Sequence, residues 1–359
     1  MYRVRPAKEG DLDAIVAIAR CLDTVNLPSD RALLVGVVAR AVASFAGALP
    51  PFEREYLFVA EALDGGGLVG TSMVHARHGT PEQPHVFFDV VDDERYSAML
   101  NRSVRRRWLR LGFDEDGPTE LGGLTVLPAL RGGGAGLGRL LSYARLVYIG
   151  AHPGCFRDQL LAELLPPFEP DGSSRLWDAL GRPLTGLGYR EADRLSHRGK
   201  EFIRALFPVE PIFVGALPEP AQALIGAVGS ATRGVERMLG RIGFAWRGRI
   251  DPFDGGPHLT ARRDEVTLLR TLGRATVVDG AASGPWGIVA AGSGASFRAL
   301  GLPLWGSDGK VALPAAARAA LEVGVGASVW VQPMSYVTNF SATSTSIQET
   351  LKSASACSI

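Results

Sequence analysis

The order of apolar and polar positions predicts that strands and helices alternate early in the chain. The first run, YRVRPA at 2–7, is typical of a strand. In GDLDAIVAIARCL, 10–22, apolar residues recur every three or four positions, which predicts a helix with an aspartate near its start. A second helix is predicted for 26–47, where Ser29 or Asp30 is suited to be the N-cap.

Two further patterns predict a hairpin and a βα unit. The β-rich runs 56–61 and 68–76 are separated by LDGGG, which is typical of a hairpin. The run PTELGGLTVL, 118–127, predicts another strand. It leads into RGGGAGLGRLLSYAR, 131–145, where a glycine-rich loop precedes the apolar stripe of a helix. A strand, a glycine loop and a helix in this order predict a βα unit.

The pattern changes further along the chain. One short strand is predicted at 212–218, among short helices at 173–181, 199–207, 218–228 and 231–244, the last ending at Gly243. From about 259 onward the chain consists of short β-rich runs, which predict a small β-barrel-like module. These runs are 276–280, 286–292, 310–314 and 326–333.

We therefore expect an α/β (α+β) fold in four segments. They are an N-terminal α/β portion at 1–150, a second α/β portion at 151–258, the small β module at 259–334 and a tail at 335–359. Eleven of the 25 tail residues are Ser or Thr, and only Glu349 and Lys352 carry charge. Such a segment cannot bury enough apolar surface to offset its ordering entropy, so we predict a flexible tail.

Composition narrows the classes of partner. The chain has 38 basic and 37 acidic residues, a net charge of +1, which argues against nucleic acid or a membrane surface as partner. The basic run 102–110 is interpreted as a solvated face, with a phosphorylated ligand as the alternative. Cys21, Cys155 and Cys357 are too few and too scattered for a disulfide framework or a metal site. With no signal-peptide pattern and no apolar run long enough to span a membrane, we expect a cytoplasmic protein.

The glycine loop is the strongest candidate ligand site. Free backbone N–H groups at a helix N-terminus favour an anion, and glycines let a pyrophosphate approach closely. The alternative is a flexible βα turn without a ligand. The loop is not a dinucleotide fingerprint, because no acidic residue closes a second strand about 20 residues on. It is also not a P-loop, because no Gly-Lys-Ser/Thr follows.

The motifs resemble those of a known family. Arg131-Gly132-Gly133-Gly134-Ala135-Gly136 reads R-x-x-G-x-G, which is similar to the coenzyme A pyrophosphate loop of GNAT acyltransferases, and 231–248 resembles their late helix. The chain as a whole, from about 2 to 334, resembles the arginine N-succinyltransferases, most specifically in DGPTEL, EADRLS, PVEPI and FDGGP. The resemblance implies a GNAT-like mixed sheet with helices, a second GNAT-like portion and a homo-oligomer. It also implies succinyl-CoA or another acyl-CoA as co-substrate, the α-amine of arginine as acceptor and no permanently bound cofactor or metal.

Several positions depart from the family pattern. The family's proton-donor histidine is Gly229 here, and glycine cannot exchange a proton. The arginine of the family's A-E-M-R-G is Leu165, and a carboxylate suited to a guanidinium is Thr260. Leu124 matches the family position that contacts succinyl-CoA. The coenzyme loop is therefore retained, whereas several recognition and acid–base groups are replaced, which predicts altered or lost activity.

The remaining candidates for acid–base chemistry are Glu120 and His258. Glu120 lies on the strand before the loop, and its alternative role is a carboxylate in a surface pair. His258 lies in the family's substrate segment and could shuttle a proton, with a surface or satisfied histidine as the alternative. The other histidines have no spacing typical of ligands, so we interpret them as structural: His75, His78, His85, His152 and His197.

Two functions follow. The first is an acyl-CoA-dependent N-acyltransferase, active or changed. The second is a non-catalytic leader or carrier domain whose Ser/Thr/Cys-rich tail, 335–359, resembles the core of a ribosomally made, post-translationally modified peptide. In that case a peptide-modifying enzyme would be the partner, because Ser, Thr and Cys are the side chains that dehydration and cyclisation use. An ordinary tail without such a role is the alternative to this second hypothesis, and a regulatory coenzyme A sensor is a third hypothesis.

Overall fold

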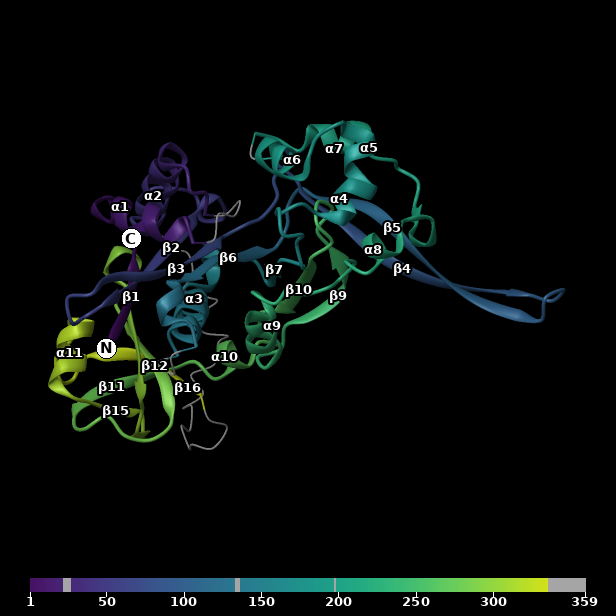
Figure 1. The fold of residues 1–359 in the computed structure, drawn as a ribbon. Helices are drawn as coiled ribbons and strands as arrows, with labels where there is room; N and C mark the ends of the chain where they lie inside the picture. Colours follow the sequence, from purple (N-terminus) through teal and green to yellow (C-terminus); the bar gives the residue numbers. More distant parts are fainter. Residues whose placement is uncertain (22–26, 133–135, 197, 335–359) are drawn as a thin grey trace. The chain divides into compact units, whose positions relative to one another are not determined.

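The computed structural model describes residues 1–334 except 22–26, 133–135 and 197. It has a mixed α/β fold with extensive sheet and helices, which confirms the predicted fold class (Figure 1). The tail 335–359 and three residues of the glycine loop lie outside the described residues, so the structure does not bear on the peptide-carrier hypothesis. In the described part of the chain, no helix is both long and apolar enough to cross a membrane.

Contacts divide the chain into two compact units, each built from non-consecutive segments. Unit 1 comprises Met1–Ala76, Leu121–Asp158 and Arg263–Ile359, and unit 2 comprises Arg77–Glu120 and Gln159–Arg262. The four-segment division expected from the sequence stays a prediction about the chain's organisation. The contacts group segments that are distant in sequence, because strands pair across those distances.

Unit 1 contains a sheet in which β11 and β15 pair in parallel, whereas pairs such as β1 with β2 and β2 with β3 are antiparallel. Its strands, in spatial order, are β14 (Gly306–Ser307), β15 (Lys310–Leu313), β11 (Gly273–Asp279), β16 (Ser328–Pro333), β12 (Trp286–Ala291), β13 (Arg298–Pro303), β1 (Tyr2–Pro6), β2 (Glu55–Ala62), β3 (Gly67–His75) and β6 (Thr119–Val126). Its helices are α1 (Leu12–Ala19), α2 (Arg31–Phe45), α3 (Leu137–Ala151), α10 (Thr267–Arg270) and α11 (Ala315–Leu321). Short 3-10 turns, such as η3 (Pro128–Leu130) and η6 (Gly294–Ser296), connect them.

Local rules account for the helices of unit 1. The Asp30 carboxylate caps α2, since its Oδ1 accepts hydrogen bonds from the backbone N–H groups of Ala32 at 2.7 Å and Leu33 at 3.2 Å. This decides between the two predicted caps. The apolar faces of α1 and α2 pack on β2 and β3 through fully buried side chains such as Ile15 and Leu34. This burial is the main term that stabilises these helices.

Unit 2 contains a second run of strands. In spatial order they are β7 (Gln159–Glu163), β10 (Pro257–Arg262), β9 (Ala245–Ile250), β4 (His85–Ser97), β5 (Arg102–Asp114) and β8 (Ile212–Phe213), and the first two residues of β6 pair with β7. Its helices are α4 (Arg175–Ala179), α5 (Gly181–Thr185), α6 (Tyr189–Ser196), α7 (Glu201–Leu206), α8 (Glu219–Gln222) and α9 (Arg233–Gly240). The core includes Trp177, whose indole stacks on Phe253 with ring centroids 5.0 Å apart.

Some predicted elements of unit 2 differ from those observed. The predicted helix 218–228 is reduced to the four residues of α8, and the predicted strand 212–218 is reduced to the two of β8. Strand β8 ends where the 3-10 turn η5 (Val214–Ala216) begins, and α8 gives way to a turn in which Gly226 adopts a left-handed φ of 74°. Helix α9 ends at Gly240 rather than at Gly243, which adopts a left-handed φ of 110°.

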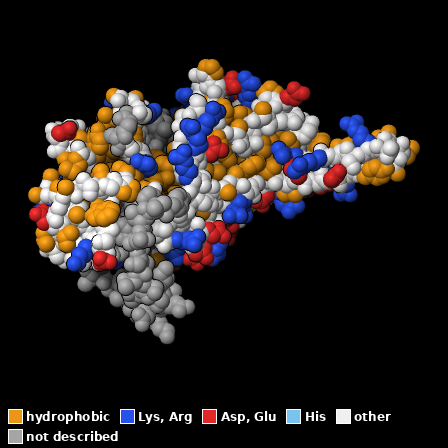
Figure 2. All heavy atoms as spheres, turned by 90° about the horizontal axis from the view of Figure 1, so that it is seen from below, with side chains coloured by type: hydrophobic (Ala, Val, Ile, Leu, Met, Phe, Trp, Pro, Cys, Tyr) orange, Lys and Arg blue, Asp and Glu red, His pale blue; other side chains and the backbone are white. Residues whose placement is uncertain are grey.

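A long hairpin formed by β4 and β5 was not predicted. Each strand has 13 residues, and the hairpin extends beyond the neighbouring strands of unit 2 (Figure 1). The basic run 102–110 forms most of β5, where Arg106 and Arg107 make ion pairs with Asp93 and Asp92 across the hairpin. Apolar side chains gather at the tip, where Met99 is 98% exposed (Figure 2). Arg105, Arg106 and Arg107 of this run are thus paired within the chain.

Candidate functional site

Histidines and carboxylates that are distant in sequence come together inside unit 2. His85 is the first residue of β4, Glu163 is the last of β7, and His258 is the second of β10. Glu163 and His258 face each other because β7 and β10 pair in antiparallel register at these two positions. We call the following seven residues the His–carboxylate cluster: His78, His85, Glu120, Glu163, Asp251, Asp254 and His258.

Glu120 and His78 form a close pair in this cluster. Oε2 of Glu120 lies 2.8 Å from Nδ1 of His78, and the backbone N–H of His78 donates to the carbonyl of Pro118 at 2.7 Å. The Glu120 side chain is 2% exposed, whereas that of His78 is 23% exposed. Burial alone would lower the pKa of His78, but the charge and the hydrogen bond of Glu120 outweigh it and raise that pKa. The pair is therefore a buried carboxylate that holds an accessible imidazole.

Glu163 contacts the two most deeply buried histidines. Its Oε1 lies 3.1 Å from Nε2 of His85 and 3.5 Å from Nε2 of His258, and the two imidazole rings stack with centroids 5.2 Å apart. Burial lowers the pKa of His85 to about 3, and it lowers the pKa of His258 as well. Both rings are therefore neutral at neutral pH, and each keeps one nitrogen lone pair for a proton or a ligand.

Two aspartates complete the cluster in the turn between β9 and β10. Oδ1 of Asp251 accepts hydrogen bonds from the backbone N–H groups of Phe253 at 2.6 Å and Asp254 at 3.2 Å. Burial, together with the charge of Glu163, raises the pKa of Asp251 to about 7. Burial and the charge of Asp251 likewise raise the pKa of Asp254. Burial is the larger cause of both shifts, whereas the neighbouring histidines lower the pKa of Glu163 although burial acts in the opposite direction.

The structure brings together both residues singled out for acid–base chemistry. Glu120 and His258 belong to the same cluster, and both are buried rather than on the surface. The interpretation of His78 and His85 as structural stays a prediction, but both side chains belong to the cluster. No linear spacing could have revealed this, since Glu120, His85 and His258 lie on three different strands and His78 lies outside any strand or helix.

The position of the family's histidine is closed to any side chain. Gly229 is buried, and its backbone N–H donates to the carbonyl of Leu165 at 2.9 Å. A Cβ atom at 229 would lie 2.6 Å from the carbonyl oxygen of Pro166. Because that oxygen belongs to the backbone, a histidine could enter only if the 165–166 segment moved.

The predicted coenzyme segment lies in unit 1. Gly133, Gly134 and Ala135 are outside the described residues, so the contacts predicted for them stay a prediction. Gly136 is the N-cap of α3 in a left-handed conformation, φ 63°, and no side chain caps the helix. The exposed Arg131 donates from Nε to the carbonyl of Val126 at 2.8 Å, and Leu124 is half-buried on β6. An uncapped helix start leaves backbone N–H groups available to an anion.

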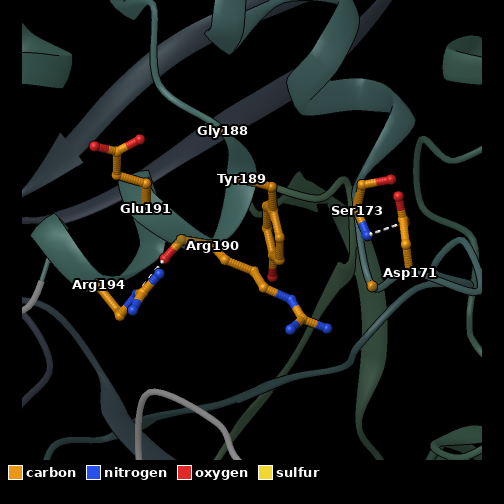
Figure 3. Close-up of a pocket in the computed structure, with 8 residues that line it drawn as sticks. Asp171, Ser173, Gly188, Tyr189, Arg190, Glu191 and Arg194 are labelled. Carbon is orange, nitrogen blue, oxygen red and sulfur yellow. Dashed lines mark hydrogen bonds between the residues drawn. The ribbon is translucent and has the colours of Figure 1, made fainter.

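A separate open pocket in unit 2 lies around the start of α6. Figure 3 shows the Arg190 side chain extending from this helix, with Tyr189 beside it. On the other side of the pocket, Asp171 accepts a hydrogen bond from the backbone N–H of Ser173 at 2.9 Å. Burial raises the pKa of Tyr189, and the charge of Asp254 adds to this. None of the residues that line this pocket belongs to the His–carboxylate cluster.

Comparisons with known proteins agree with the resemblance seen in the sequence. The family model for the arginine N-succinyltransferase beta subunit matches residues 2–268, and the model for the C-terminal domain of that subunit matches 272–333. An arginine N-succinyltransferase of Citrobacter koseri is 32% identical over 283 residues, which are 78% of this chain and 81% of that protein. One from Yersinia pestis is 33% identical over 281 residues, 77% of this chain and 79% of that protein.

A solved structure is similar over nearly the whole chain. It is the arginine/ornithine succinyltransferase subunit AI from Pseudomonas aeruginosa, with a TM-score of 0.82 and 32% identity over 93% of this chain and 99% of that one. The fold and these matches place the protein among the transferases. More narrowly, the chain belongs to the arginine N-succinyltransferase family.

Proposed function

We propose that the protein is an N-acyltransferase that moves a succinyl group from succinyl-CoA to the α-amine of arginine or of a related amine. Family membership supports the reaction type. The observation that carries the proposal is the pair of Glu120 and His78, because acyl transfer to an amine needs a group that removes a proton from the ammonium form.

The proposed step uses the neutral imidazole of His78 as the proton acceptor. The amine loses one proton to this ring and attacks the carbonyl carbon of the thioester, so a C–N bond forms as the C–S bond breaks. The nitrogen loses its second proton to solvent as the C–S bond breaks, and the leaving thiolate of coenzyme A takes the proton held by His78. Glu120 stabilises the imidazolium through its close contact at 2.8 Å, in the way that a buried carboxylate orients a catalytic histidine.

The geometry at Gly229 supports a relocated proton acceptor. Since the backbone of Pro166 closes position 229, the family's histidine has no equivalent there. His78 is the cluster histidine whose side chain is 23% exposed, whereas His85 and His258 are 2% and 0% exposed. A proton could reach His258 only through its neighbours such as Glu163, so the shuttle role expected for His258 depends on that carboxylate.

We propose the segment 131–136 and the start of α3 as the binding site for the coenzyme's diphosphate. The uncapped N-terminus of α3 and the left-handed Gly136 support this proposal. The position of Leu124 on β6, the strand that leads toward the segment, is consistent with a contact to the acyl-CoA.

Thiol release from succinyl-CoA tests the proposed function directly. The protein is mixed with succinyl-CoA and with arginine, ornithine or another amine, and the thiol and the product mass are measured. We expect amine-dependent thiol release and a product that is one succinyl group heavier than the amine. Reactions without an amine control for hydrolysis. Absence of both turnover and succinyl-CoA binding with every amine would exclude the proposal.

A further inference from the structure

We propose that Glu163, Asp251 and His258 form a binding site for one divalent transition-metal ion of the zinc type. Its ligands do not include Glu120 or His78, although Glu163 also lies near His78, and the inference goes beyond the proposed acyl transfer. Each of the three residues offers one ligand atom, and these atoms all lie within 4.8 Å of one another. Ligand atoms around a tetrahedral zinc ion are about 3.4 Å apart. Side-chain rotations that bring the ligand atoms at most about 1.4 Å closer together would therefore complete the site.

The state of His258 points to a ligand independently of this spacing. Its side chain has no exposed surface, and neither ring nitrogen has a hydrogen-bond partner among the described residues. Buried polar atoms are nearly always paired, because leaving one unpaired costs about 1–3 kcal/mol. Nε2 points to Oε1 of Glu163 at 3.5 Å, which is too long for a good hydrogen bond. A metal ion bound between Nε2 of His258 and Oε1 of Glu163 would give each of these two atoms a partner.

The backbone holds the three ligands in place. Glu163 and His258 are register partners on the adjacent strands β7 and β10, so their side chains lie on the same face of the sheet. Asp251 directly follows β9, and the backbone N–H groups of Phe253 and Asp254 fix its Oδ1. Its second oxygen, Oδ2, is therefore the one that would bind the ion. Ligands supplied by a sheet and a tight turn form a rigid site.

The donor set selects the class of metal. A neutral imidazole together with two carboxylates suits zinc, cobalt or a similar ion, whereas calcium and magnesium prefer oxygen atoms alone. His85 lies 3.1 Å from Oε1 of Glu163 and stacks on His258, so it is placed to orient both ligands from the outer sphere. The carboxylates of the cluster also favour a cation over an anion.

Titration of the full-length protein with metal ions tests this inference. The protein is first dialysed against EDTA and then titrated with Zn²⁺ by calorimetry and with Co²⁺ by visible absorption. We expect one ion per chain and the ligand-field bands of a cobalt ion bound by nitrogen and oxygen. His258→Thr and Glu163→Gln should each weaken binding by at least about tenfold, since even outer-sphere changes cost 10–100-fold. His75→Gln, a histidine of unit 1, is the matched control and should leave binding unchanged.

Three results would overturn the inference. The first is no binding of either ion by the wild-type protein. The second is unchanged metal affinity in both His258→Thr and Glu163→Gln, or loss of binding only when His85 is replaced. Either outcome would place the ion outside the proposed site. The third is a thiolate-to-cobalt charge-transfer band, which would assign binding to a cysteine. Circular dichroism checks the folding of each variant. If His258→Thr does not fold, Glu163→Gln still tests the site, because Glu163 is only half-buried. No substrate is present, so these results are independent of the acyl-transfer assay.

Discussion

Oε2 of Glu120 lies 2.8 Å from Nδ1 of His78, within a cluster of three histidines and four carboxylates of which four residues are buried. The contact joins the second residue of β6 to a residue that precedes β4 and lies in no strand or helix. It gives the imidazole a raised pKa although burial acts in the opposite direction. Loss of the Glu120–His78 contact should therefore change the pH dependence of the reaction as well as its rate.

Glu120→Gln should lower kcat/KM for acyl transfer by about 10²-fold or more, the usual contribution of a general base. Because Glu120 raises the pKa of His78, the neutral acceptor form of the wild-type protein appears only as the pH rises above the ordinary histidine value. Without that charge, burial lowers the pKa, so the rising limb of the pH–rate profile should move to lower pH. Glu115→Gln, an exposed carboxylate paired with Arg204, is the control and should change neither quantity. If the rising limb of the pH–rate profile lies at the same pH in the wild type and in Glu120→Gln, the proposed role of the Glu120–His78 pair is contradicted.

Gly229→His should not restore or improve activity, although it recreates the residue found in the family. The new Cβ would lie 2.6 Å from the carbonyl oxygen of Pro166, so the backbone must shift. We expect a loss of about 1–3 kcal/mol in the free energy of unfolding, as for other overpacked sites. Urea denaturation measures this loss. Gly234→His is the control, since no heavy atom lies within 4 Å of a Cβ at that position. Equal stability of the two variants would show that position 229 is open.

His85 should make the protein less stable as the pH falls. Its folded-state pKa is about 3, while a histidine in the unfolded chain titrates near 6.5. The stabilising contribution is therefore complete above about pH 6.5 and is lost as the pH falls toward 3, with a total on the order of 4–5 kcal/mol. In metal-free protein, His85→Gln should flatten the decline in the free energy of unfolding between pH 6.5 and pH 4. His75→Gln serves for comparison, and an equally steep decline in the His85 variant would refute the prediction.

Gly134→Asp should abolish coenzyme A binding if the glycine segment holds the diphosphate. The aspartate adds both bulk and negative charge at the predicted phosphate position, so the expected loss of affinity exceeds that of Gly134→Ala, which adds bulk alone. Calorimetry with coenzyme A measures both variants. Equal affinity of wild type and Gly134→Asp would show that the coenzyme binds elsewhere.

The sequence determined much of the local structure. Spacing and residue type were enough to predict β1, α1, α2 and the hairpin of β2 and β3, because helix periodicity, caps and glycine turns act over a few residues. The β4–β5 hairpin was missed for the opposite reason. Its arginines look like a solvated charge run until Asp92 and Asp93 face them across the register, and that pairing is not local.

The candidate site shows the same division. The sequence alone singled out Glu120 and His258 through motif resemblance, and it marked Gly229 as a lost proton donor. Only the tertiary structure decided that His78 and His85 join them, and that the backbone of Pro166 closes position 229. The physical reason is that strand pairing sets which side chains meet in a sheet. The pairing register of strands that are distant in sequence therefore decided which side chains meet, and the spacing of residues along the chain does not predict that register.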